Sequence, residues 1–141
     1  MNTTIQRVVN MKIYFAGSIR GGRQDEKLYC KIIEALKEKH QVLTEHVGNL
    51  NLSATEGKGD KAIYEQDTAW LRECDVVVAE CTQASLGVGY ELAYAEAHGK
   101  KVHIFYRPKE TQLSAMLSGN EGFRIHEYDC EEEILTQVRL I

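Results

Sequence analysis

A glutamate, Glu91, follows a serine and two glycines in the stretch SLGVGYELA, and these residue types suit an anion site beside a nucleophile. Gly87 and Gly89 let backbone N–H groups approach a ligand closely, where the helix that follows Ser85 to Gly89 presents unpaired donors and its positive dipole end. We expect Glu91 in the first helical turn, where the dipole favours an ionised carboxylate that could act as a nucleophile. A glutamate that merely suits a helix start is the alternative.

Another glycine-rich stretch, the first along the chain, combines three glycines with a hydroxyl and two arginines. It matches neither the dinucleotide G-x-G-x-x-G pattern nor a P-loop, which ends in Gly-Lys-Ser/Thr. A plain turn needs glycine but no guanidinium, whereas an arginine fork suits a phosphate, so the arginines favour phosphate binding. The stretch consists of Gly17, Ser18, Ile19, Arg20, Gly21, Gly22 and Arg23.

Two further side chains, Asp67 and His46, have suitable chemistry in less distinctive surroundings. Asp67 lies in the middle of a predicted helix and within a turn of Trp70, although aspartate is a poor interior helix former. His46 follows the second predicted strand, at the end where α/β proteins place ligands. A solvent-facing aspartate and an ordinary loop histidine are the plainer alternatives.

Five β-rich runs alternate with helical patterns, which predicts an α/β three-layer sandwich with a parallel sheet, flavodoxin-like or Rossmann-like. The run after Asp75 is continuously apolar, as in a strand buried on both faces. We expect the strand order 2-1-3-4-5, in which strands one and three are neighbours and open a crevice at their carboxyl ends. The predicted strands are 12–16, 42–44, 76–79, 102–106 and 123–128, and the predicted helices are 25–39, 61–73, one that Gly99 ends, 111–117 and 129–140.

Both glycine-rich stretches flank this crevice, together with Tyr14 on the first strand and Glu91 on the helix after the third. Their joint placement favours a nucleotide site over two loops that only turn the chain.

The composition of the chain argues against several classes of binding partner. The 141 residues carry 17 basic and 21 acidic side chains, a formal net charge of −4 that argues against a nucleic acid polymer as partner. Four cysteines without a C-x-x-C pair and five histidines without ligand spacing predict no metal and no cofactor. Reduced thiols, no signal peptide and no membrane-spanning run predict a cytoplasmic or nuclear protein.

The length predicts a single domain over residues 11–141, preceded by a poorly ordered extension of residues 1–10. A glycine-rich and polar segment, 47–60, could be a mobile lid or simply disordered.

Six strings along the chain carry a family resemblance. They are YFAGSIRGGR, LTEHV, EQDTAW, DVVVAE, SLGVGYELA and LSAM. In this order, from about Lys12 to Tyr128, the chain resembles the 2′-deoxynucleoside 5′-phosphate N-hydrolases of the nucleoside 2-deoxyribosyltransferase-like superfamily. The loop from Gly48 to Asp60 and the segment after Gly119 differ, which leaves the base preference open.

The resemblance implies cleavage of the N-glycosidic bond of a deoxynucleoside monophosphate to a free base and 2-deoxyribose 5-phosphate. It implies that Glu91 is the nucleophile, that Asp67 assists the departing base and that Tyr14 orients the glutamate. It also suggests purine and modified pyrimidine substrates such as 5-hydroxymethyldeoxyuridine monophosphate. The implied phosphate contacts are Gly17 to Arg23, Ser85, Gly87 and Ser114.

The residue types agree with this chemistry, because an ionised carboxylate can trap an oxocarbenium-like sugar as a glycosyl-enzyme that water then hydrolyses. A deoxyribosyltransferase, in which a second base accepts the sugar, and a non-catalytic nucleotide sensor are the alternatives. We also expect a homodimer in which Ser114 reaches the partner's phosphate site, because strand four is not adjacent to strand one and the reach within one chain looks long. A helix cap within its own chain is the plainer role for Ser114.

Overall fold

The computed structural model of the protein describes residues 10–18, 25–44 and 59–141. The predicted N-terminal extension apart from Asn10, the segment Ile19 to Arg23, His46 and the predicted loop up to residue 58 lie outside these residues. The described elements are β1 (Lys12–Ala16), α1 (Glu26–Lys37), β2 (Gln41–Val42), α3 (Asp60–Glu73), β3 (Val76–Glu80), α4 (Leu86–Ala97), β4 (Lys101–Tyr106), α5 (Ala115–Ser118), β5 (Arg124–Glu127) and α6 (Glu131–Val138).

The described strands form one parallel sheet of order β2-β1-β3-β4-β5, so the predicted order is confirmed. β1 pairs with β3 over four residues, with Tyr14 opposite Val77 and Ala16 opposite Ala79. Since the connections of β1 and β3 leave toward opposite sides, the carboxyl ends of these strands border the expected crevice.

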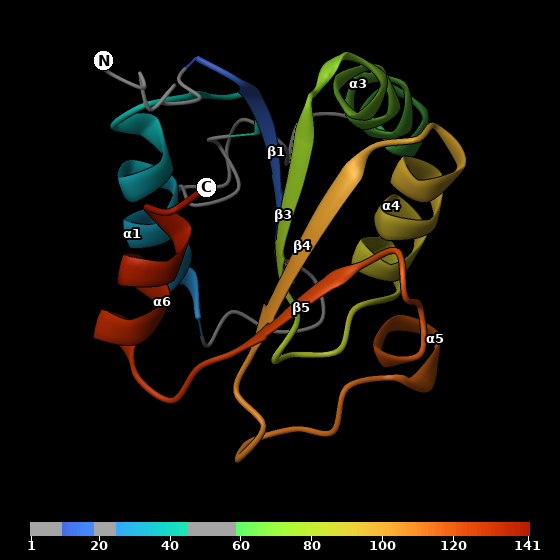
Figure 1. Ribbon diagram of the computed structural model, residues 1–141. Coiled ribbons are helices and arrows are strands. Elements are labelled where there is room, and N and C mark those ends of the chain that lie inside the picture. Colours follow the sequence, from blue (N-terminus) through green and yellow to red (C-terminus); the bar gives the residue numbers. More distant parts are fainter. Residues whose placement is uncertain (1–9, 19–24, 45–58) are drawn as a thin grey trace, which may run out of the picture.

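Helices cover both faces of the sheet, with α1 and α6 on one face and α3 and α4 on the other (Figure 1). Side chains of β1 alternate between the two layers: Ile13 and Phe15 pack with α1 and α6, whereas Tyr14 and Ala16 pack with α3 and α4. All five residues of β3 are buried, as its apolar run predicts. The alternation therefore directs Tyr14 toward the layer that carries Asp67 and Glu91.

Element ends differ from the predictions where side chains replace backbone hydrogen bonds. The second strand ends at Val42, because the Thr44 hydroxyl accepts a hydrogen bond from the Phe15 N–H and donates one to the Phe15 carbonyl, both at 2.8 Å. The predicted helix 111–117 begins only at Ala115, since the Ser114 hydroxyl caps it by accepting from the Met116 N–H. No helix in the described part of the chain is long and apolar enough to cross a membrane.

Candidate active site

A hydrogen bond between β1 and α4 forms the centre of the candidate site. The Tyr14 hydroxyl donates to Oε2 of Glu91. Tyr14 is held in place by the sheet, where only 1% of it is exposed, so its hydroxyl is fixed relative to the backbone. The bond fixes the orientation of the Glu91 carboxylate and stabilises its charged form.

Glu91 is the sixth residue of α4 and lies in its second turn, so its expected place in the first turn is wrong. The effect of a helix dipole falls off within the first turn. The state of Glu91 therefore depends on its surroundings rather than on the start of the helix.

The carboxyl group of Glu91 is harder to ionise than an ordinary glutamate. Its pKa is raised from 4.5 to about 7: burial is the largest cause, the hydrogen bond from Tyr14 acts to lower the pKa, and the neighbouring charge of Asp67 acts to raise it. We expected the helix start to keep the Glu91 carboxylate charged, but the carboxyl group instead changes its charge near neutral pH. A pKa near the operating pH is typical of catalytic groups.

Asp67 joins this pair from α3. It lies in the third turn of that helix and is half-buried, so the solvent-facing alternative is wrong. Its charge raises the pKa values of both Tyr14 and Glu91, in each case after burial as the larger cause. Asp67 is therefore close enough to Tyr14 and Glu91 for its charge to disfavour their ionised forms. The structure thus brings together the three predicted catalytic residues from β1, α3 and α4.

The described start of the first glycine-rich stretch is held closely against α1. A Cβ atom on Gly17 would lie 2.7 Å from the ring of Tyr29, so only glycine fits there without a shift. The Ser18 N–H donates to the Tyr29 hydroxyl at 3.2 Å. The Ser18 hydroxyl is buried and has no hydrogen-bond partner among the described residues, so it is available to a ligand.

The second stretch starts α4. The Ser85 hydroxyl caps the helix by accepting from the Val88 N–H at 3.2 Å, and the Ser85 carbonyl accepts from the Gly89 N–H at 3.1 Å. The Gly89 N–H is therefore already used within the helix. Space around Gly87 and Gly89 is open, since a Cβ atom on either would meet nothing closer than 3.8 Å. The helix start can thus be approached closely by an anion.

Ser114 lies on another side of α4 from Glu91. It lines a groove of about 630 Å³ with Ser85 and Gly89, and along α4 this groove continues over Ala93. Along α4, Glu91 is two residues from Gly89 and two residues from Ala93. Two residues correspond to a rotation of about 200° around a helix, so Glu91 points to a different side of α4 from these two. Ser114 therefore shares a groove with the start of α4 within its own chain, contrary to the expectation of a long reach, but on another side of the helix from Glu91.

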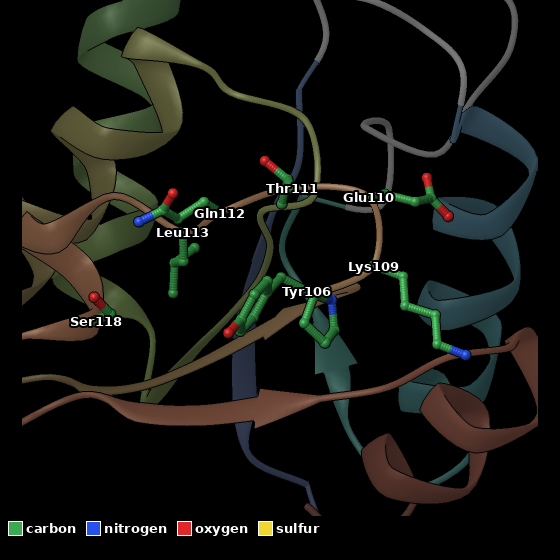
Figure 2. A pocket seen from close by; sticks show the side chains of 8 residues that line it. Tyr106, Lys109, Glu110, Thr111, Gln112, Leu113 and Ser118 are labelled. Carbon is green, nitrogen blue, oxygen red and sulfur yellow. The ribbon is translucent and has the colours of Figure 1, made fainter.

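A second hollow, of about 540 Å³, lies beside the loop that follows β4. Figure 2 shows Tyr106, Leu113 and Ser118 among its lining side chains. None of the predicted site residues that the structure describes lines it, so it is separate from the candidate active site.

Comparison with known proteins identifies the family of this chain. Residues 13–132 match the family model described as nucleoside 2-deoxyribosyltransferase. The chain belongs to this family. The family resemblance noted in the sequence is thereby confirmed.

Two curated relatives of the chain carry the same name. The chain is similar to the 5-hydroxymethyl-dUMP N-hydrolase of Mus musculus, with 47% identity over 137 residues that cover 93% of this chain and 79% of the relative. Its identity to the protein of that name from Homo sapiens is 49%, covering 85% of this chain and 72% of the relative.

Two solved structures share the fold. A Clostridium botulinum CMP N-glycosidase aligns with a TM-score of 0.64 at 21% identity, covering 90% of this chain and 97% of that one. A 2-deoxyribosyltransferase from Bacillus psychrosaccharolyticus aligns with a TM-score of 0.61 at 16% identity, covering 88% and 90%. These two likenesses support the fold alone.

Beside the predicted site lies a buried charge network that the sequence reasoning missed. Glu80, at the end of β3, is 1% exposed and accepts hydrogen bonds from the Thr82 and Tyr128 hydroxyls, each at 2.6 Å. Arg107, just after β4, contacts the same cluster and also binds Asp25 at the start of α1. The sequence contains one signal that could have predicted this network: Glu80 follows the apolar run 76–79 and Arg107 follows the run 102–106. Both charged residues thus stand at the carboxyl edge of the sheet, where ligands bind.

Within the described residues, no group of three or more His, Cys, Asp or Glu side chains could hold a metal ion.

Proposed function

We propose that this protein hydrolyses the N-glycosidic bond of 2′-deoxynucleoside 5′-monophosphates through a covalent deoxyribosyl intermediate on Glu91. The observation that carries the proposal is the Tyr14–Glu91 hydrogen bond beside Asp67, in a chain of the nucleoside 2-deoxyribosyltransferase family. Relatives named 5-hydroxymethyl-dUMP N-hydrolase make 5-hydroxymethyl-dUMP the first substrate to test.

In the first step the ionised Glu91 carboxylate attacks C1′ of the sugar and the bond from C1′ to the base nitrogen breaks. Asp67 gives its proton to the departing base, so the pair holds one proton when the reaction begins. In the second step water attacks C1′, the ester bond to Glu91 breaks, and the proton from water returns to the pair. The products are the free base and 2-deoxyribose 5-phosphate.

Tyr14 has two roles in this mechanism. Its hydroxyl holds the carboxylate in one orientation, and it stabilises the charge that the attack requires. A sugar without a 2′-hydroxyl forms the oxocarbenium-like state more readily, because an electron-withdrawing group is absent. The preference for deoxyribose then follows in part from the chemistry.

The 5′-phosphate is proposed to bind between Gly17-Ser18 and the start of α4. The free Ser18 hydroxyl and the open helix start at Gly87 support this placement. Arg20 and Arg23, which are outside the described residues, complete the proposed site by their charge. Binding energy from the remote phosphate positions C1′ over Glu91, so its removal is expected to affect kcat as well as KM.

A product assay tests the proposal directly. Incubation with 5-hydroxymethyl-dUMP, a panel of other deoxynucleotides, the matching ribonucleotides and the unphosphorylated nucleosides should release base only from deoxynucleotides at a substantial rate. Glu91→Gln should lower turnover by at least about a thousandfold, because a covalent nucleophile is lost, while the exposed Glu121→Gln serves as control. Turnover of Glu91→Gln within about tenfold of the parent would refute the nucleophile.

A deoxyribosyltransferase is the second candidate, since the family model bears that description. It differs in whether water or a second base accepts the sugar. Addition of a free base to the assay distinguishes the two, because a transferase would form a new nucleotide in proportion to that base. Absence of any base release with the full panel would instead favour the nucleotide sensor.

We also propose a homodimer in which Ser114 contributes to the phosphate site of the partner subunit. Two apolar side chains at the groove support an interface there: Leu86 is 97% exposed and Met116 is 82% exposed. Across a two-fold axis the same patch serves both chains. The position of Ser114 on another side of α4 from Glu91 is consistent with a role in a neighbouring site.

Subunit mixing tests the shared site. Glu91→Gln and Ser114→Ala protomers, each poorly active alone, should recover activity when mixed, because one site of every mixed dimer keeps both residues. Ser118→Ala, at the other end of α5, controls for damage to that helix. A monomer by light scattering, or no recovery after verified exchange, would contradict the proposal.

A further inference from the structure

Arg107 has no place in the proposed chemistry, yet it joins separate parts of the chain at the carboxyl edge of the sheet. Its backbone N–H donates to the Thr82 hydroxyl at 3.0 Å, and its Nη1 donates to the Tyr128 hydroxyl. Only 11% of its side chain is exposed. Thr82 follows β3, Arg107 itself follows β4 and Tyr128 follows β5. The ends of these three strands therefore fix the orientation of the buried Arg107 side chain.

The other side of the Arg107 guanidinium binds the start of α1. Its Nη2 donates to both carboxylate oxygens of Asp25, at 3.0 and 2.9 Å, and its Nε donates to Glu110 at 2.6 Å. Figure 2 shows Glu110 on the side of its loop that faces α1. Asp25 is the N-cap residue of α1, but its carboxylate makes no cap hydrogen bond, since it is bound to Arg107 instead.

The first turn of α1 transmits this contact to the predicted phosphate site. The Tyr29 N–H donates to the Asp25 carbonyl at 2.9 Å, and the Tyr29 hydroxyl accepts from the Ser18 N–H at 3.2 Å. The ring of Tyr29 lies directly against Gly17. A continuous path of contacts therefore runs from Arg107 through Asp25 and Tyr29 to the Ser18 backbone.

Arg107 also offsets negative charge near this site. Three described carboxylates lie within 4 Å of its guanidinium: Asp25 at 2.9 Å, Glu110 at 2.6 Å and Glu80 at 3.8 Å. Without the guanidinium, the partly buried Asp25 would lie uncompensated at the start of α1. Like charge near a binding site weakens the binding of an anion.

We propose that Arg107 is a positioning residue for the anion site, which it serves by holding the first turn of α1, and so Ser18, in place. The inference rests on the proposed function, because it takes Gly17-Ser18 as part of a phosphate site. Arg107 itself does not touch the substrate. It fixes a group that does, and its charge removes the repulsion that the carboxylates around it would exert on a phosphate.

Inhibition by inorganic phosphate tests this role. In Arg107→Gln the Ki of phosphate, measured against nucleotide hydrolysis, should rise about tenfold, since both the clamp and the compensating charge are lost. Arg107→Lys should fall between Gln and the parent, because an ammonium keeps the charge but cannot bind Asp25 and Glu110 as a fork. Arg139→Gln, which breaks the exposed pair with Glu38, is the matched control and should leave Ki unchanged.

Two further measurements separate positioning from general stability. The kcat/KM for the matching unphosphorylated nucleoside should stay within about threefold of the parent in Arg107→Gln, whereas a purely structural defect would lower both substrates alike. Tyr29→Phe keeps the ring but removes the acceptor of the Ser18 N–H, so its phosphate Ki should rise at least about threefold. This variant decides the matter if Arg107→Gln does not fold.

Three results would overturn the inference. One is an equal loss of activity on nucleotide and nucleoside in Arg107→Gln. The second is a phosphate Ki within about twofold of the parent in both Arg107→Gln and Tyr29→Phe. The third is a parent enzyme that phosphate does not inhibit, which removes the anion site and so overturns the phosphate part of the proposed function as well.

Discussion

Replacement of Tyr14 by phenylalanine should move the pH dependence of catalysis in a defined direction. The Tyr14 hydroxyl donates to the Glu91 carboxylate and so acts to lower the pKa of Glu91, which with this bond in place is raised to about 7, chiefly by burial. Phenylalanine keeps the ring in the sheet but removes this donor. The carboxyl group of Glu91 then holds its proton to higher pH, so the acidic limb of kcat/KM is expected to shift upward.

The size of the shift follows from the strength of the bond. A hydrogen bond to a charged group contributes about 1.5 to 3 kcal/mol. Since one pKa unit corresponds to about 1.4 kcal/mol, the pKa should rise by about one to two units. At pH 7 the ionised fraction of Glu91 then falls from about half to between about 1 and 10%, so Tyr14→Phe should be about 5- to 50-fold slower. Near pH 9.5 its rate should approach that of the parent.

The assay is kcat/KM for a deoxynucleoside monophosphate between pH 5.5 and 9.5. Tyr94→Phe is the matched control, because Tyr94 is also on α4 but its hydroxyl accepts from Arg72 instead. The reasoning is refuted if the acidic limb of Tyr14→Phe stays in place or moves to lower pH. A loss of the same factor at every pH would mean that Tyr14 affects only the orientation of Glu91.

Three other predictions concern stability. Glu91 binds its proton more tightly in the folded state, so the folded protein gains stability from this proton below pH 4.5 and loses it as pH rises through about 7. Glu91→Gln should therefore raise the free energy of unfolding in urea at pH 8 by up to about 3 kcal/mol and by little at pH 4, with Glu121→Gln as control. His103 shares a 2.9 Å hydrogen bond with His126, and burial, followed by that neighbour, lowers its pKa to about 4. Because His103 is only partly buried, solvent screening reduces this effect; the parent should still lose stability as pH falls from 6.5 to 4, and His103→Gln should flatten this loss in pH-dependent urea melts. Gly17→Ala should lower stability by about 1 to 3 kcal/mol in thermal or urea unfolding, since its Cβ would press on a buried aromatic ring; an unchanged midpoint would show that the ring yields freely.

The sheet could be predicted from the sequence because its strands are apolar runs bounded by polar or glycine residues. Val76 to Ala79 is buried on both faces, and this burial is visible as an uninterrupted apolar run. The order of strands followed from the common arrangement of alternating strands and helices. The exact end of the second strand could not be predicted from the sequence. There the Thr44 hydroxyl takes the place of backbone hydrogen-bond partners, which a pattern of residue types does not reveal.

The candidate catalytic residues could be named from their types, but their electrostatics could not be predicted. A shift of a few residues in the start of α4 moved Glu91 from the first turn to the second and changed what sets its pKa. The network around Arg107 was missed because Asp25 and Arg107 are 82 residues apart. Only the position of α1 against the end of β4 brings these charges together.

The hydrogen bond from Tyr14 to Glu91 joins residues that are 77 positions apart in the chain. Such a contact exists only after β1 has paired with β3, and parallel pairing between distant segments is slow because a long loop must close first. A collapsed chain with its helices formed but this pairing absent would carry a solvated glutamate with no partner to orient it. Catalysis therefore reports on completed folding, and during refolding from urea the enzyme activity should return with the slowest structural phase, after the helical circular dichroism has recovered.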